Sequence, residues 1–372
     1  MKRLYYWISL LLLLYVSSNQ VYSQIGVLCN DWGDCDISNF IIDTSNRDQI
    51  YDSRNGWSLS PHDTIRMLVV FAELVYTDTI PDPSLNWDNH YWDAHHLPRW
   101  ADSLFAAYDT TDFSYKRVTK YFQYASSNDH IVLGDYLMAP NNSEVFSINT
   151  HNGEITASEI ATEVNNQLQS GFVTKHGLSS FNEFDKWTPD KVGLPKIKNG
   201  NNRWDYVVFA VRNSLNPDNP NGHGTNISNQ LLGHQIDKAC IVCVGDSKNP
   251  AHVIRHEYAH MLLGGNNFHT CGGGKADTYN YWIPQTGGWA LLGLYGSSLM
   301  CWNAWDRYRL GWKAAGNTYD ISARSSDGVT EVNGDIDISN GNGTYVLRDF
   351  VTTGDAIRIK LPFIDEAREY PE

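Results

Sequence analysis

One pentapeptide constrains this chain more than any other feature: His256, Glu257, Tyr258, Ala259 and His260. Residues four apart on an α-helix differ by about 400° of rotation, so the two histidines lie about 40° apart on one face. Both imidazoles then point at a single ion, and the glutamate beside them can accept a proton. The H-E-x-x-H pattern therefore predicts a zinc-binding helix with His256 and His260 as metal ligands and Glu257 as general base.

The residues around the motif are typical of a helix. Asn249 is suited to cap the N-terminus, and Pro250 takes the first helical position, where proline is tolerated. The two glycines that begin at Gly264 are expected to end the helix. His252 lies one turn before His256, and we interpret it as a packing residue or a residue behind the ligands rather than as a ligand.

The third ligand is less directly marked. A catalytic zinc usually has three protein ligands and a water. The long stretch after the motif contains no glutamate, and His269 is the only histidine that follows the motif. We therefore predict His269 as the third ligand, ahead of Asp277, with Asn266 behind both.

Several stretches of the chain carry a resemblance to a known family. They are the H-E-x-x-H motif and residues 66–71, 121–126, 299–305 and 308–312. Over residues 63–315 the chain resembles the secreted immune-inhibitor-A-like metallopeptidases. The resemblance implies a metzincin-type zinc endopeptidase, often with bound calcium, in which Met300 forms a methionine turn beneath the zinc. The usual metzincin pattern places a glycine three residues and a histidine six residues after the motif, whereas here Gly264 is four on and His269 nine on.

The N-terminus and the charge indicate where the protein acts. Residues 1–23 combine Lys2 and Arg3 with a short apolar run, as in a secretory signal; a membrane anchor is the alternative, but the run is short for a span. The net charge of −14 becomes −16 without Lys2 and Arg3. Such an acidic chain is a poor partner for nucleic acid. We expect a secreted protein, extracellular or periplasmic, with no stable membrane insertion after signal removal.

An exported chain with six cysteines is expected to form disulfide bonds. In a metzincin-like site the segments that carry Cys271 and Cys301 converge beneath the zinc, so we predict a bond between these two residues. The alternative pairs one of them with Cys240 or Cys243. Those two residues lie three apart on a predicted strand and face opposite sides, which argues against a redox pair.

Apolar runs and helical spacing predict an α+β chain with a zincin-like catalytic domain and an all-β C-terminal segment. The expected strands are 65–75, 131–137, 206–211 and 239–244, and the expected helices are 100–107, 157–168, 249–263 and 303–310. The expected domains are the signal peptide 1–23, an N-terminal arm or propeptide 24–62, the catalytic domain 63–315 and the segment 316–372. In the last segment we predict paired strands at 345–348 and 356–361 that continue in a longer protein, and a solvated turn at 333–337 in place of a calcium loop.

The motif and the resemblance together predict a secreted zinc-dependent endopeptidase. Zinc-activated water would attack the peptide carbonyl of a protein or peptide substrate, with Glu257 as the base. One alternative is a non-catalytic secreted binding or adhesion protein on a protease-like scaffold, against which the intact motif argues. Another is a zinc hydrolase with a different kind of substrate.

Overall fold

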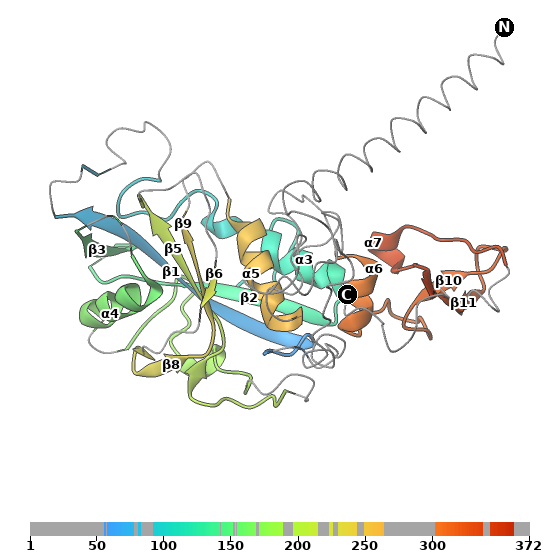
Figure 1. The fold of residues 1–372 in the computed structure, drawn as a ribbon. Helices are drawn as coiled ribbons and strands as arrows, with labels where there is room; N and C mark the ends of the chain where they lie inside the picture. The colour runs from blue at the N-terminus through green and yellow to red at the C-terminus, as the bar shows by residue number, and fades with distance from the viewer. Residues whose placement is uncertain are drawn as a thin grey trace, which may run out of the picture. The chain divides into compact units, whose positions relative to one another are not determined.

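A computed structural model describes residues 56–360 of this chain with internal gaps, and all structural statements concern these residues. The gaps are residues 57, 78–80, 83–91, 142, 152, 154, 169–170, 189–195, 215–222, 226–229, 244–248, 264–301 and 338–342. The described chain contains both helices and strands (Figure 1), which confirms the predicted mixture of the two.

A six-stranded, mostly parallel sheet forms the centre of the described chain. The strand order is β2-β1-β5-β9-β6, and β3 pairs with β1 beyond the end of β2. Strand β6 runs antiparallel to β9, and the other pairings of this sheet are parallel. The strands are β1 (Asp63–Tyr76), β2 (His130–Leu137), β3 (Phe146–Thr150), β5 (Val207–Arg212), β6 (His223–Thr225) and β9 (Ala239–Cys243).

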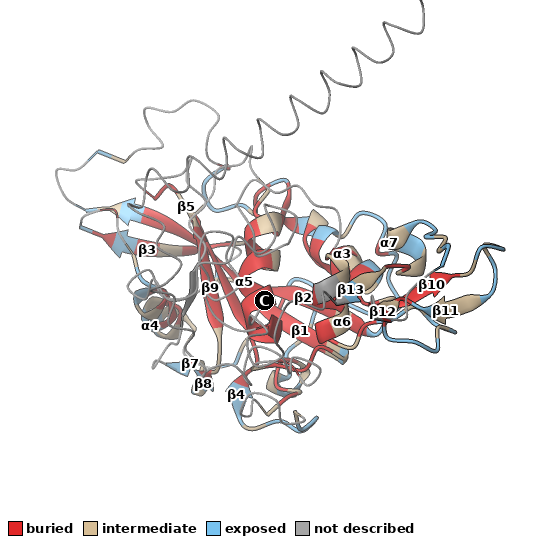
Figure 2. Ribbon diagram, turned by 45° about the vertical axis from the view of Figure 1, so that its right-hand side comes forward, coloured by how far each residue is buried: buried red, intermediate tan, exposed pale blue. Residues whose placement is uncertain are grey.

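Helices cover both faces of the sheet. One hydrophobic cluster holds α3 (Arg117–Ala125) and α5 (Ala251–Leu263), and a second cluster holds α4 (Ala157–Gln167). Alternate side chains of β1 enter the two clusters: Met67, Val69 and Phe71 the first, and Leu68, Val70 and Ala72 the second. Because both faces are buried (Figure 2), the strands read as continuous apolar runs. The result is a mixed α/β arrangement, and the finer metzincin-type fold stays a proposal.

Most predicted elements of this region are confirmed. The four expected strands correspond to β1, β2, β5 and β9. Helix α4 follows the helical spacing of its buried residues, and Thr156 and Glu159 form a capping box at its start. Three short strands form a second, smaller sheet that shares no strand pairing with the main one. Their order is β4 (Arg203–Trp204), β8 (His234–Ile236) and β7 (Gln230–Leu231).

The prediction of a helix at 100–107 is wrong. Only a short 3-10 helix forms, at Ala101–Ser103, and another follows at Phe181–Glu183. The backbone after Ala101–Ser103 bonds to distant neighbours instead of to itself: Val118 N donates to Leu104 O at 2.9 Å, and Gly134 N donates to Ala106 O at 3.0 Å. The Ala106 amide, which a continuing helix would pair with the carbonyl of Asp102, donates instead to Thr119 Oγ1 at 2.9 Å.

The segment just before β1 packs against α5. The amides of Ser58 and Leu59 both donate to the carbonyl of Met261, at 2.8 and 3.1 Å, near the C-terminal end of the helix. Leu59 is fully buried in the same cluster as α5. Trp312 Nε1 donates to Pro61 O at 2.6 Å. These bonds satisfy a helix carbonyl that has no partner within the helix.

Replacing Leu59 by alanine is therefore expected to lower the free energy of unfolding by about 2–5 kcal/mol, as for other fully buried leucines. Leu347, which is 50% exposed, offers a matched control. Its replacement by alanine should change stability by less than about 0.5 kcal/mol. Urea denaturation of both variants measures this, and equal values would show that the segment before β1 is not part of the core.

The C-terminal part begins with the predicted helix. Helix α6 (Ala304–Arg309) is capped by Asn303, whose side chain accepts from Asp306 N at 2.7 Å. Arg307 then joins separate parts of the chain, because its Nη2 donates to Ser127 Oγ at 2.8 Å and its Nη1 to Phe350 O at 3.3 Å.

Beyond α6 three predictions are wrong. The segment is not all-β, because α7 (Phe350–Thr353) forms where Asp349 caps a turn. The strands at 345–348 and 356–361 do not pair with each other: Val346 bridges to Arg324 of β10, and β13 pairs with β12. The turn at 333–337 is instead part of the strands, and Asp335 forms an ion pair with Arg358. The strands are β10 (Ser322–Arg324), β11 (Glu331–Asn333), β12 (Asp335–Asp337) and β13 (Arg358–Lys360).

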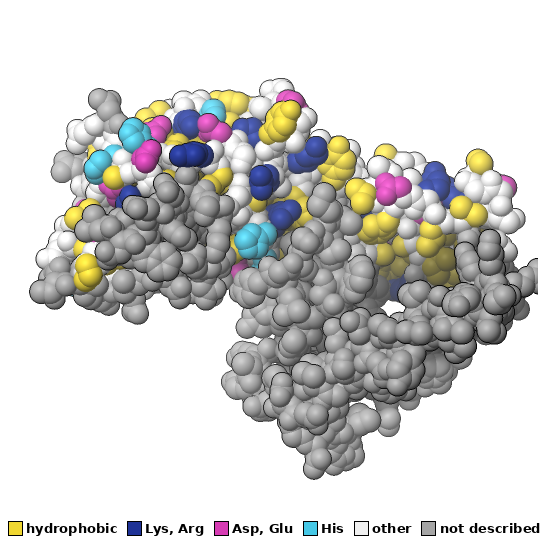
Figure 3. Space-filling model, turned by 90° about the horizontal axis from the view of Figure 1, so that it is seen from above, with side chains coloured by type: hydrophobic (Ala, Val, Ile, Leu, Met, Phe, Trp, Pro, Cys, Tyr) yellow, Lys and Arg dark blue, Asp and Glu magenta, His cyan; other side chains and the backbone are white. Residues whose placement is uncertain are grey.

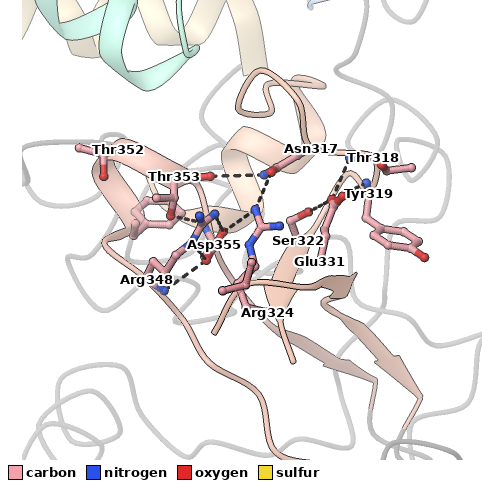
Figure 4. Close-up of polar contacts among 12 residues, drawn as sticks. Asn317, Thr318, Tyr319, Ser322, Arg324, Glu331, Arg348, Thr352, Thr353 and Asp355 are labelled. Atoms are coloured by element: carbon pink, nitrogen blue, oxygen red, sulfur yellow. Dashed lines mark hydrogen bonds and ion pairs between the residues drawn. The ribbon is translucent and has the colours of Figure 1, made fainter. Parts of the chain in front are cut away.

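A buried carboxylate explains why this segment departs from simple strand pairing. The side chain of Asp355 is inaccessible and accepts from Arg348 Nε and Nη2 at 2.8 and 3.0 Å. Arg324 Nη2 lies 3.6 Å from the same carboxylate and donates to Asn317 Oδ1 at 2.8 Å (Figure 4). A buried carboxylate is stable only with such partners, so Arg348 and Arg324 are held beside Asp355.

Candidate metal site

Helix α5 is built as its sequence predicts. Asn249 Oδ1 accepts from Ala251 N at 2.9 Å, which is the bond of an N-cap residue. Ile254 N donates to Pro250 O at 3.0 Å, so the helical bonds begin at the proline. The described part of the helix runs to Leu263, and the two glycines that follow lie outside the described residues. It is buried over most of its surface, and tertiary packing holds its position.

The two motif histidines come together on α5. Their ring centroids are 5.0 Å apart and the ring planes cross at 84°. A histidine bound to zinc at about 2.1 Å has its ring centre about 3.2 Å from the ion, so two tetrahedrally placed rings lie about 5 Å apart. The observed spacing of His256 and His260 therefore fits one zinc ion. The residues are only 4% and 8% exposed, which keeps the rings in a fixed setting.

Glu257 is equally buried, at 4% exposure, and its charge acts on Cys240 and Tyr206. Burial raises the pKa of the Cys240 thiol, and the charge of Glu257 raises it further. Burial also raises the pKa of Tyr206, to which the charges of Cys240 and Glu257 add. Both groups therefore stay neutral beside the glutamate. The arrangement leaves a carboxylate next to the histidine pair in a place shielded from bulk water.

The cysteines of β9 are confirmed as residues on opposite faces. Cys240 is buried in the cluster that holds α5, and Cys243 packs against the cluster that holds α4. Both are free thiols. Burial raises the pKa of Cys243 as well, so neither thiol is activated as a nucleophile.

Tyr258 anchors the opposite side of α5. It is fully buried, and its hydroxyl lies 3.0 Å from His130 Nε2. His130 Nδ1 lies 3.0 Å from the carbonyl of Asp63, which can only accept, so Nδ1 carries the proton and Tyr258 donates to Nε2. The rings of His130 and Tyr258 stack at 5.9 Å, and Trp312 stacks on His130 at 6.1 Å. This contact could not be predicted from the sequence, because a lone histidine before an apolar strand carries no recognisable pattern.

This buried histidine makes stability depend on pH. Burial lowers the pKa of His130 to about 4. The bond to the Asp63 carbonyl and the charge of Asp129 oppose this shift, and the charge of His62 adds to it. Between about pH 6.5 and 4 the histidine is protonated in the unfolded chain but stays neutral in the folded chain. The free energy of unfolding therefore falls as the pH falls. We expect a loss of about 2–3 kcal/mol by pH 4.5 from this residue. Urea denaturation at pH 7 and 4.5 tests it, with His130→Gln as the reference that lacks the titration.

His252 is half-buried on the surface of the helix. Burial lowers its pKa, a bond with the Asn249 backbone opposes the shift, and the charge of Arg255 adds to it. Arg255 itself lies over the Tyr121 ring, with Cζ 4.3 Å from the centroid. His252 thus contacts the Asn249 backbone, and Arg255 contacts the Tyr121 ring.

The remaining predicted site residues lie outside the described part of the chain. They are His269, Asp277, Asn266, Met300, Cys271 and Cys301. Among the described residues, no group of three His, Cys, Asp or Glu side chains is arranged to hold a metal. The third ligand and the disulfide therefore stay predictions.

The edge of the sheet, the surface charges and the length of the helices bear on the kind of partner. Within the described part of the chain, strand β6 is the last strand of the sheet beside β9, and α5 contacts both strands. On the face in Figure 3, Lys and Arg side chains are scattered among acidic, histidine and hydrophobic ones. No helix within the described ranges is long and apolar enough to cross a membrane.

No protein-family model matches the chain, and no curated protein matches it. The functional assignment therefore rests on the residues and their geometry.

Proposed function

We propose that this protein is a secreted zinc-dependent endopeptidase. The observation that carries the proposal is the pair of histidine rings, 5.0 Å apart on one helix, with buried Glu257 next to them. The mostly parallel sheet, with α5 following β9 and packed on it, supports a zincin-type catalytic domain. His256, His260 and, as predicted from the sequence, His269 would hold the metal.

The roles of the residues follow from their chemistry. Zinc, when bound, lowers the pKa of a water to about 7 and polarises a carbonyl group. Glu257 takes a proton from the attacking water and passes it to the leaving amine. His256 and His260 would hold the metal next to that carboxylate. The burial of all three side chains limits exchange with bulk water and strengthens their electrostatic interactions.

The sheet edge supports a peptide as substrate. Among the described strands, β6 ends the sheet, and α5 contacts both β6 and its neighbour β9. An extended peptide can add to such an edge through main-chain hydrogen bonds, which bind it with little regard to sequence. A peptide bound there would pass beside the helix that carries Glu257.

Metal analysis combined with a protease assay tests the proposal. We expect one zinc per chain and hydrolysis of casein that stops with a nitrogen-donor chelator and returns with zinc. Calcium added together with the chelator is the control, because such chelators prefer zinc to calcium. Absence of zinc would overturn the proposal. Bound zinc without hydrolysis of a broad peptide library would favour a binding protein or a hydrolase with another substrate.

A further inference from the structure

We propose that Tyr258 and His130 are positioning residues that set the rotation of α5 about its axis and thereby aim His256 and His260 at the metal. The inference rests on the proposed zinc site. Tyr258 lies two residues from each histidine, which is about 200° of rotation. Its side chain therefore leaves the helix on the side away from the ligands.

The contacts of Tyr258 hold this side of the helix from several directions. Its ring packs edge-on against Phe122 of α3, at 5.2 Å, and against Tyr206, at 5.3 Å. Its hydroxyl donates to His130 at the start of β2. His130 is in turn held by the carbonyl of Asp63 at the start of β1. A single side chain thus ties the helix to α3 and to two strands of the sheet.

The hydrogen bond from the Tyr258 hydroxyl to His130 is directional, whereas apolar packing alone is not. Tyr258 and His130 are both fully buried, so a broken bond would leave polar atoms without water. The Asp63 carbonyl fixes which ring nitrogen of His130 accepts, and so fixes where the Tyr258 hydroxyl must lie. The rotation of α5 therefore has one preferred value.

A small rotation would matter to a metal. An atom about 5–6 Å from the helix axis moves by about 2 Å when the helix turns by about 20°. Metal–ligand distances tolerate only about 0.2 Å. Losing the Tyr258 hydroxyl should therefore weaken zinc binding even though no ligand changes.

The test compares two tyrosines that each lose only a hydroxyl. Tyr258→Phe is expected to lower zinc affinity by about 10–100-fold, the effect typical of residues that orient ligands. It should also alter the visible spectrum of the cobalt-substituted protein, which reports ligand geometry. Tyr136→Phe is the control, because Tyr136 is as buried but its hydroxyl donates to Ala101 O. Chelator competition measures affinity, and thermal unfolding shows that both variants are folded.

A second pair of variants tests the partner. His130→Gln retains a donor for Asp63 and an acceptor for Tyr258, and should keep most of the zinc affinity; His130→Leu has neither and should lose it. If wild-type protein binds zinc and Tyr258→Phe matches Tyr136→Phe, the positioning role is wrong and the proposed function stands. If wild-type protein binds no zinc, both fall together.

Discussion

Replacing Glu257 by glutamine is expected to leave zinc binding intact and to lower peptidase activity by about 10²–10⁴-fold. The amide has nearly the shape of the carboxylate but cannot take the proton of the attacking water. The side chain is buried, at 4% exposure, so no other base replaces it easily from solvent. The loss should appear in kcat, because the interaction is made only as the water reacts.

Glu163→Gln is the matched control for this experiment. Glu163 lies on α4, on the other face of the sheet, and its carboxylate bonds to Asn166 and Gln167. That variant should keep both zinc and turnover. Metal content and casein hydrolysis are measured for both variants. Unchanged turnover in Glu257→Gln would assign the base to another residue and contradict the role given to Glu257.

Replacing His260 by alanine is expected to lower zinc affinity by more than about 100-fold, since even residues behind a ligand contribute about 10–100-fold. His256→Ala should do the same, because the two rings form a pair at 5.0 Å. His269→Ala should match them if His269 is the third ligand. Activity should fall with the affinity at limiting zinc.

The third histidine of α5 is a control within the same helix. His252 is half-buried and lies one turn before His256. His252→Ala should keep zinc affinity within a few-fold, which separates damage to the helix from loss of a ligand. Full zinc occupancy in His269→Ala would contradict the third-ligand prediction and favour Asp277. Full occupancy in His260→Ala would contradict the site itself.

Local rules predicted much of this fold. Some features involve only residues a few positions apart, so they can be recognised in the sequence. They are the apolar spacing along α4 and the helix caps at Asn303 and Asn249. The buried strands were predicted because a strand covered on both faces is apolar throughout. The motif on α5 belongs to the same class, because helix geometry alone brings His256 and His260 together.

Predictions that depended on distant partners were less successful. Residues 104–107 have a helical composition, but the Ala106 amide donates to the side chain of Thr119 instead of to a carbonyl one turn back. Two apolar stretches near the C-terminus looked like paired strands, yet buried Asp355 draws Arg348 toward itself and each stretch pairs elsewhere. Neither outcome is visible in local pattern, because the deciding partner is far along the chain or is a buried charge.

The sequence by itself determined the candidate site chemistry: two imidazoles one helical turn apart and a carboxylate beside them. Only the tertiary structure decided how that helix is held. The carbonyl of Met261 meets the amides of Ser58 and Leu59, and Tyr258 meets His130. These contacts join residues more than a hundred positions apart, and no periodicity links them. They form because burial leaves each polar group in need of a partner, and the folded chain places one within reach.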